Sequence, residues 1–298
     1  MTQAQDVPAS GALDDIGWVL WSGTVGLESP VAPRIVAALA GGYSRLSVSP
    51  LDVARAADEG TTADELGRRI RDAGLEIVLD PVMNWYGGSP RADSRFARFP
   101  ADESLAMAES LQVATITVIG QATSDLPLEQ VAEPFAAVCD RAAGFGAQVH
   151  LEFIPMTAIP DLESAWTVVQ GADRTNGGVL FDTWHFFRGN PDFWMLERVP
   201  GARIFAVQID DAAAEVRGSM REDTQNRLLP GAGDFDLPRA VRALDRIGAL
   251  RWVGPEVISP VTAAMPPVEA ARVAGDRVRE LIARVRSESA QAAPVAQR

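Results

Sequence analysis

The feature that most constrains the fold is the alternation of eight short apolar runs with segments of helical spacing. The runs are rich in Val, Ile and Leu, which together with the helical segments between them is typical of parallel βαβ units. Eight such units, at intervals of roughly 30 to 40 residues, favour an α/β fold closed into a (β/α)8 TIM barrel over an open doubly wound sheet. The expected strands are residues 18–21, 45–48, 76–81, 115–119, 148–153, 178–182, 204–209 and 252–257.

The barrel is predicted to form a single domain over residues 16–286, because barrels of this kind need about 250 residues. Residues 1–15 are predicted to be a flexible N-terminal segment and residues 287–298 a flexible C-terminal tail. Helix starts and ends are indicated by a capping box of Thr62 with Glu65, by Asp161 as a cap, and by the glycines Gly74, Gly146 and Gly248.

Composition and charge exclude several classes of function. With 47% hydrophobic and 22% charged residues the chain can bury a substantial core. A net charge of −13 argues against a nucleic-acid partner, and the absence of an apolar run of about 18 residues argues against a membrane span. The single cysteine, Cys139, excludes an intrachain disulfide and is predicted to be a core thiol. The start of the chain does not resemble a secretory signal, so a cytoplasmic protein is expected.

A candidate metal site follows from the last four expected strands. Side chains at the carboxyl ends of barrel strands converge on one mouth, and here they are Glu152, Asp182, Gln208 and Glu256. Because an ionised carboxylate in an apolar run is costly without a partner, a cation is expected among them. Oxygen donors favour a hard ion, so the sequence predicts one divalent metal ion, Mn²⁺, Mg²⁺ or Co²⁺, bound by these four residues.

The two histidines are predicted to have different roles. His185 follows Asp182 in a D-x-x-H pattern, which brings the imidazole to the same mouth and favours a contact with a polar substrate. His150 lies two residues before Glu152 and is predicted to be a packed core histidine. Two histidines are too few for a metal site built from several imidazoles. No G-x-G-x-x-G motif follows the first strand, which also weakens a dinucleotide-binding interpretation.

Aromatic residues near the expected strand ends have two interpretations. They either pack within the barrel or form an apolar wall that stacks on a sugar ring. Trp184 and Trp85 are predicted to bind substrate in this way. The full candidate set is Trp21, Trp85, Tyr86, Trp184, Phe186, Phe187 and Trp194.

At these positions the chain resembles the sugar phosphate isomerase/epimerase superfamily, the xylose isomerase-like barrels. This superfamily includes ketose 3-epimerases, inosose dehydratases and dehydroshikimate dehydratases. The resemblance covers most of the chain and is strongest over residues 149–257, where LEF, FDTWH, NRLLPGAGDFD and GPEV occur in the expected order. The Pro-Gly-Ala-Gly turn at 230–233 is the most specific of these motifs.

The resemblance implies roles for individual residues. Glu152 and Glu256 would bind the metal and move the substrate proton, Asp182 would be a further ligand, and His185 and Arg227 would contact substrate oxygens. Two positions depart from the ketose epimerases: Gln208 replaces a histidine ligand, and Ala158 replaces a glutamate that helps to bind the sugar. An amide oxygen can still bind a hard metal, so the departures bear more on the substrate than on the ion.

The chemistry expected of this set is proton abstraction next to a carbonyl with an enediolate intermediate, which requires a base and a positive charge beside the oxygen. The predicted activity is a metal-dependent isomerase or epimerase of a keto-sugar or related polyol. Two alternatives remain open: a lyase, either a dehydratase of the inosose or dehydroshikimate type or a C-glycoside-cleaving enzyme on 3-keto sugars, and a non-catalytic ligand-binding barrel. The endonuclease IV type of barrel is improbable with two histidines and a charge of −13. The resemblance also implies a homodimer or homotetramer.

Overall fold

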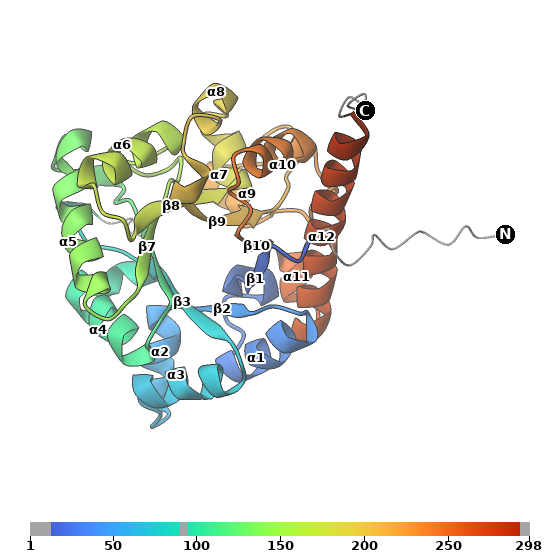
Figure 1. The fold of residues 1–298 in the computed structure, drawn as a ribbon. Coiled ribbons are helices and arrows are strands. Elements are labelled where there is room, and N and C mark those ends of the chain that lie inside the picture. The colour runs from blue at the N-terminus through green and yellow to red at the C-terminus, as the bar shows by residue number, and fades with distance from the viewer. Residues whose placement is uncertain (1–12, 90–93, 293–298) are drawn as a thin grey trace, which may run out of the picture.

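A closed barrel of eight parallel strands forms the centre of the computed structural model, which describes residues 13–89 and 94–292 (Figure 1). The neighbouring strands around the barrel follow the order β1-β10-β9-β8-β7-β5-β3-β2. The predicted fold class is therefore confirmed. The barrel strands are β1 (Gly17–Leu20), β2 (Arg45–Val48), β3 (Glu76–Val82), β5 (Thr115–Ile119), β7 (Gln148–Glu152), β8 (Gly177–Asp182), β9 (Ile204–Ile209) and β10 (Trp252–Pro255).

Helices surround the strands as an outer layer (Figure 1). The larger ones are α1 (Val31–Ala40), α2 (Pro50–Asp58), α3 (Ala63–Asp72), α4 (Ala101–Leu111), α5 (Ala132–Ala143), α6 (Leu162–Ala172), α10 (Leu237–Arg246) and α12 (Pro267–Ala292). Short helices follow β8, β9 and β10, namely α7 (Thr183–Arg188), α8 (Phe193–Leu196), α9 (Met220–Thr224) and α11 (Pro260–Ala263). The 3₁₀ turns are η2 (Ser22–Val25), η3 (Arg95–Arg98), η4 (Leu128–Gln130) and η5 (Gly201–Arg203).

Two layers of apolar packing explain why the alternating pattern closes into a barrel. All five residues of β5 are buried, as expected for a strand covered on both faces. Inside the barrel, Val19, Trp21 and Leu180 belong to a small cluster, whereas the large cluster between strands and helices includes Ile116, Val149 and many others. The strands therefore present one face to the inner cluster and the other to the helices.

Local sequence signals position the helices as expected. The Thr62 side chain accepts a hydrogen bond from the backbone N–H of Glu65 at the start of α3, and Asp161 accepts one from Ser164 at the start of α6. Gly74 follows α3 with a φ of 87°, a left-handed conformation that favours glycine. Cys139 is fully buried in α5, and burial raises the pKa of its thiol to about 12, as expected for a core thiol.

The ends of the elements differ from the expected ranges by up to two residues for the strands, and by more at the C-terminus. The predicted start of a tail at residue 287 is wrong, because α12 continues to Ala292. Glu288 forms an ion pair with Arg242 of α10, and the Ser289 hydroxyl donates to the carbonyl of Val285, so these residues extend the helix against the barrel. The rest of both predicted flexible segments, residues 1–12 and 293–298, lies outside the described residues.

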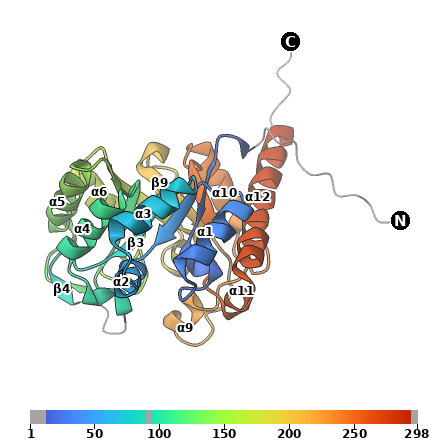
Figure 2. The same cartoon turned by 90° about the horizontal axis from the view of Figure 1, so that it is seen from below.

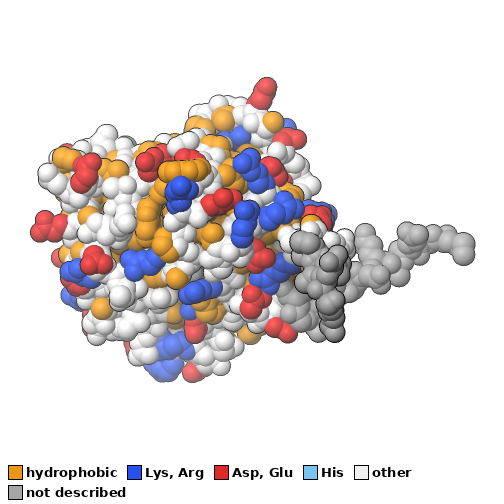
Figure 3. All heavy atoms as spheres, turned by 45° about the horizontal axis from the view of Figure 1, so that its top comes forward, with side chains coloured by type: hydrophobic (Ala, Val, Ile, Leu, Met, Phe, Trp, Pro, Cys, Tyr) orange, Lys and Arg blue, Asp and Glu red, His pale blue; other side chains and the backbone are white. Residues whose placement is uncertain are grey.

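The loops that follow the strands gather at one end of the barrel, where the label of α9 lies in Figure 2. A small antiparallel pair, β4 (Gly88–Ser89) with β6 (Thr123–Ser124), joins the loops after β3 and β5. Among the described residues, no helix is both long and apolar enough to cross a membrane. Acidic and basic side chains are interspersed over the face that Figure 3 shows.

Candidate active site

A cavity of about 500 Å³ opens at the carboxyl ends of the barrel strands. Its wall takes residues from both halves of the barrel, so the strand ends converge as predicted. The residues that matter for the chemistry are Ser22, Asp80, Ile119, Glu152, His185, Arg227 and Glu256.

Glu152, Asp182 and His185 come together at the floor of this mouth. One ligand atom from each lies within 4.8 Å of those of the other two, a spacing that could hold a metal ion. The Nε2 atom of His185 is 3.2 Å from Oε1 of Glu152. Asp182 also caps α7, since its Oδ1 accepts a 2.8 Å hydrogen bond from the backbone N–H of His185. The D-x-x-H spacing thus turns the imidazole back toward the carboxylates.

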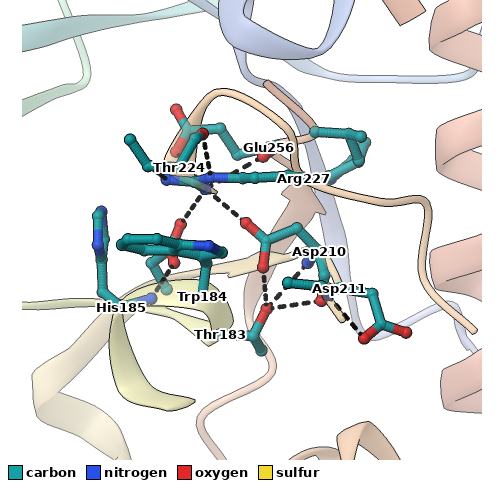
Figure 4. Close-up of polar contacts among 12 residues, drawn as sticks. Thr183, Trp184, His185, Asp210, Asp211, Thr224, Arg227 and Glu256 are labelled. Carbon is teal, nitrogen blue, oxygen red and sulfur yellow. Dashed lines mark hydrogen bonds and ion pairs between the residues drawn. The ribbon is translucent and has the colours of Figure 1, made fainter. Parts of the chain in front are cut away.

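Arg227 lies at the centre of a second group of carboxylates (Figure 4). Its Nη1 atom is 2.7 Å from Oδ2 of Asp182, 2.5 Å from Oδ2 of Asp210 and 3.2 Å from Oε2 of Glu256. The guanidinium is almost completely buried. Burial alone would lower the pKa of Arg227, but these carboxylates raise it overall, so the side chain carries a permanent positive charge.

Gln208 is fully buried beside this group, and neither its amide oxygen nor its amide nitrogen has a hydrogen-bond partner among the described residues. In the strand register Gln208 of β9 pairs with Asp182 of β8. A buried amide normally finds a partner, because an unsatisfied polar group is costly. The unpaired amide of Gln208 therefore has capacity to bind a group placed beside Asp182.

The carboxylates of the mouth outnumber the positive charges around them. Burial, followed by the neighbouring charges of Glu152, Asp80 and Asp182, raises the pKa of Glu256 well above its usual range although Arg227 opposes the shift. Burial and Asp182 likewise raise the pKa of Asp210. The pKa of Asp182 is lowered: burial opposes this, but Arg227 and His185 outweigh it.

Such a site lacks positive charge. Together with the unpaired Gln208 amide, an excess of buried oxygen donors fits a hard divalent cation. His185 lies within the same cluster as Glu152 and Asp182, so it is a ligand candidate as well as a candidate substrate contact. The roles of Glu152, Asp182, Gln208 and Glu256 as ligands stay predictions.

The loop that carries Arg227 is fixed by a buried aspartate. The Asp211 carboxylate accepts hydrogen bonds from the backbone N–H groups of Gly231, Gly233 and Phe235. Gly231 has a φ of 83°, and a Cβ atom on Gly233 would lie 2.3 Å from the carbonyl oxygen of Ala212. The Pro-Gly-Ala-Gly turn of the sequence is therefore a structural clamp, which holds the chain that leads out of Arg227.

The predicted aromatic wall is wrong for its two main members. Trp184 is fully buried, its Nε1–H donates to Oδ2 of Asp223 at 3.0 Å, and it does not line the cavity. Trp85 is also absent from the lining, and its Nε1–H donates to the carbonyl of Ile119. The neighbours of His185 on α7 point elsewhere because successive helical residues are turned by about 100°. Phe96 is the aromatic residue of the described lining.

The other aromatic candidates also pack or lie outside the mouth. Trp21 is buried inside the barrel, 6.1 Å from His150 between ring centroids. Phe186 and Phe187 pack against Phe193. Tyr86 accepts a hydrogen bond from the backbone of Gln121, and Trp194 is 61% exposed on α8. Ala158, the second departure from the epimerases, is absent from the lining.

Two buried acids of the mouth were missed in the sequence. Asp210 follows β9, where its Oδ1 accepts a 2.7 Å hydrogen bond from the Thr183 hydroxyl and its Oδ2 binds Arg227. Asp80 is a residue of β3 that lines the cavity. Burial and then the charge of Glu152 raise its pKa to about 8. An acidic residue within the apolar strand β3 is the signal for Asp80, whereas Asp210 follows Gln208 by two positions and has no separate signal in the sequence.

Comparison with known protein families and proteins adds an independent line of evidence. A family model described as "Xylose isomerase-like TIM barrel" matches residues 36–281. The chain is 30% identical to an inosose isomerase of Bacillus velezensis over 131 residues, 43% of this chain and 46% of the relative. It is 25% identical to a 3-dehydroshikimate dehydratase of Pseudomonas aeruginosa over 217 residues, 72% of this chain and 34% of the relative. The matches thus span less than half the length of these curated relatives.

Solved structures share the fold at low sequence identity. The structure of the IolI protein with a zinc atom superposes with a TM-score of 0.76 at 18% identity, covering 91% of this chain and 99% of that one. L-ribulose 3-epimerase superposes with a TM-score of 0.69 at 16% identity, covering 94% and 99%. These likenesses support the barrel and its closure.

Proposed function

Because the chain belongs to the xylose isomerase-like TIM barrel family, we propose that it is a divalent-metal-dependent isomerase or epimerase of a keto-sugar or related polyol. The observation that carries this proposal is the convergence of Glu152, Asp182 and His185 on one point beside the unpaired amide of Gln208. The curated relatives are named for reactions on inososes and on dehydroshikimate, which are polyhydroxylated cyclic ketones.

The proposed reaction starts at the carbon next to the substrate carbonyl. Glu152 withdraws the proton from this carbon, and the electron pair of the C–H bond moves onto the carbonyl to form an enediolate. Glu256 returns a proton to the opposite face of the same carbon. A divalent ion held by Glu152, Asp182, Gln208 and Glu256 would supply positive charge beside the oxygen that becomes negative.

Neighbouring side chains would orient these groups. His185, with Nε2 at 3.2 Å from Glu152, limits the positions that the Glu152 carboxylate can take. Arg227 holds Glu256 from the other side at 3.2 Å and lines the cavity, where it can also contact a substrate oxygen. Asp210 and Thr183 fix the guanidinium in turn. The two glutamates are thus held by separate partners, as two-sided proton transfer requires.

The test uses the metal-loaded protein with inososes, keto-hexoses and 3-dehydroshikimate in deuterium oxide, followed by NMR. Incorporation of deuterium into an otherwise intact sugar supports isomerisation. We expect Glu152→Gln to lower kcat/KM by about 10²- to 10⁴-fold, because a positioned general base contributes that much. Glu163→Gln, the same change at an exposed residue of α6, is the matched control. Full activity of Glu152→Gln would refute the proposed role.

A dehydratase is the second candidate, because the dehydroshikimate dehydratase aligns with a larger part of this chain than the inosose isomerase does. Elimination shares the proton abstraction by Glu152, after which a β-hydroxyl leaves instead of a proton returning. The same NMR experiment separates the two, since elimination yields a new unsaturated ketone. The metal content of the wild type, compared with that of Asp182→Asn, addresses the third alternative. A wild-type barrel that binds no divalent ion would be a binding module.

A further inference from the structure

Asp80 is a buried acid of the mouth that the proposed reaction does not use. It lies near the end of β3, is 9% exposed and lines the cavity. In the part of the chain that the structure describes, no basic side chain forms an ion pair with it, and the strongest charge acting on it is the repulsive one of Glu152. A buried carboxyl without a counter-charge is costly, and a polar group in the cavity would lower that cost.

Asp80 lies outside the group of three possible ligands. Its oxygens do not belong to the cluster that Glu152, Asp182 and His185 form within 4.8 Å, although it interacts electrostatically with Glu152 and Glu256. In the closed barrel, β3 is separated from β9 by three strands in either direction, so Asp80 faces the side that carries Asp210 and Arg227 from across the mouth. Apolar residues that line the same cavity include Pro81, Phe96, Ile119 and Ile154.

A row of inward-facing polar groups supports Asp80 from two adjacent strands. Leu79 of β3 pairs with Ile116 of β5, and the register shifts between Leu79 and Val82, so Asp80 lies in an irregular part of the strand. Thr117 of β5 pairs in register with His150 of β7. Thr117 lowers the pKa of the Asp80 carboxyl as a hydrogen-bond donor, and its hydroxyl oxygen lies 2.9 Å from Nε2 of His150. A hydroxyl that donates to the carboxyl accepts from an Nε2–H of His150.

The donor and acceptor roles in this row determine whether Asp80 can still accept a hydrogen bond from a ligand. Burial lowers the pKa of His150 to about 3, so the imidazole stays neutral and acts as a donor rather than as a counter-charge. A carboxyl oxygen has two lone pairs, and Thr117 satisfies one of the four that Asp80 offers. Acceptor capacity therefore remains for a ligand on the cavity side.

We propose that Asp80 is a substrate-binding residue that accepts a hydrogen bond from a ring hydroxyl on the side of the mouth opposite Arg227, and that Thr117 and His150 are positioning residues for it. This inference rests on the proposed function only in taking a polyol as the ligand. A cyclic polyol carries hydroxyls around its whole ring. Asp80 is the buried acid that would accept a hydrogen bond from a hydroxyl on this side of the ring. The proposal makes Asp80 a residue that discriminates between hydroxylated and deoxygenated rings.

The test measures binding instead of turnover. An inosose, a cyclohexanone with five hydroxyls, is titrated calorimetrically into the metal-loaded protein. We expect Asp80→Leu, which keeps the volume but removes both oxygens, to weaken binding about 10- to 100-fold, and Asp80→Asn, which keeps one acceptor oxygen, to recover part of this loss. Metal content should equal that of the wild type in both variants.

Variants of Thr117 distinguish a positioning role of this residue from a packing role. They also keep the test valid if Asp80→Leu does not fold. Thr117→Val, which has the same shape without the hydroxyl, should weaken binding about 3- to 10-fold, whereas Thr117→Ser should bind as the wild type does. Asp64→Asn on the outer helix α3 is the control. Equal losses for Thr117→Val and Thr117→Ser would show a packing role and refute the positioning of Asp80.

Failure of this inference differs from failure of the proposed function. If Asp80→Leu binds the inosose as tightly as the wild type, or if the wild type binds none, the role of Asp80 is refuted, whatever the enzyme turns over. If the wild type binds the inosose through Asp80 but incorporates no deuterium, the binding role stands and the proposed isomerisation fails.

Discussion

The two halves of the barrel mouth differ in what their strand ends carry. The ends of β7 to β10 bring Glu152, Asp182, Gln208 and Glu256 together, and Arg227 lies among them. The ends of β1 to β5 add mainly small or apolar residues to the cavity wall, with Asp80 as the buried acid. In the proposed function, the first half would hold the charged groups for the chemistry and the second would contact the ligand.

The charged half is organised around one buried cation, whereas the groups that support Asp80 in the other half are neutral. Arg227 alone contacts three carboxylates, so the geometry of this half depends on one cation. In the other half, Thr117 and His150 are neutral groups. Substitutions in the two halves should therefore differ in their effects on stability and on ligand binding.

Removal of Arg227 should have the largest effect on stability. Arg227→Leu leaves Asp182, Asp210 and Glu256 buried without their counter-charge, so we expect the free energy of unfolding of the metal-free protein to fall by about 3 to 5 kcal/mol. Urea denaturation in the presence of a chelator measures this. Arg246→Leu, which removes an exposed ion pair with Glu197, is the control. A loss below about 1 kcal/mol would mean that the charged half does not depend on this cation.

A variant of Trp184 tests whether this residue contacts the substrate or only stabilises the charged half of the mouth. Trp184→Phe removes the hydrogen bond to Asp223, and we expect the free energy of unfolding to fall by about 1.5 to 3 kcal/mol, the range for a hydrogen bond to a charged group. Affinity for an inosose should stay within about twofold, because the ring does not reach the cavity. A tenfold loss of affinity with unchanged stability would restore the substrate-wall interpretation.

The pH dependence of stability should reveal Asp80, which forms no ion pair with another described residue. Its pKa is raised from 3.8 to about 8, so between these values the folded state binds more protons than the unfolded chain. The free energy of unfolding of the metal-free protein should therefore fall as the pH rises, by at most about 1.4 kcal/mol per pH unit for one group.

Asp80→Asn cannot ionise, so its stability should decline less steeply over the same pH range. Parallel denaturation series at several pH values, with and without the variant, measure the difference. Identical slopes for the two proteins would contradict the raised pKa.

The smallest effect is expected at the rim of the apolar half, where Glu28 bridges Arg55 and Arg95. All three side chains are exposed, and exposed ion pairs contribute about 0 to 1 kcal/mol. Glu28→Gln should change the free energy of unfolding by less than about 1 kcal/mol, and the change should disappear at about 1 M salt. A larger loss would show that the rim, and not the packing beneath it, holds this half together.

Much of the fold could be predicted because strand and helix periods are local properties. The eight apolar runs correspond to the eight barrel strands, since each strand is covered on both faces and must be apolar along its length. The extent of α12 could not be predicted in the same way. Residues 287–292 look small and polar, and the contact of Glu288 with Arg242 comes from a distant part of the chain.

For the candidate site, the sequence by itself determined which residues end the strands, because the barrel brings every such end to one mouth. This is why Glu152 and Asp182 were found. Only the tertiary structure decided which neighbours join them: Arg227 reaches Asp210 across 17 positions, Asp80 lies where the register of β3 and β5 shifts, and Trp184 turns away from the cavity. Those outcomes depend on side-chain directions and on strand pairing, which a linear pattern does not contain.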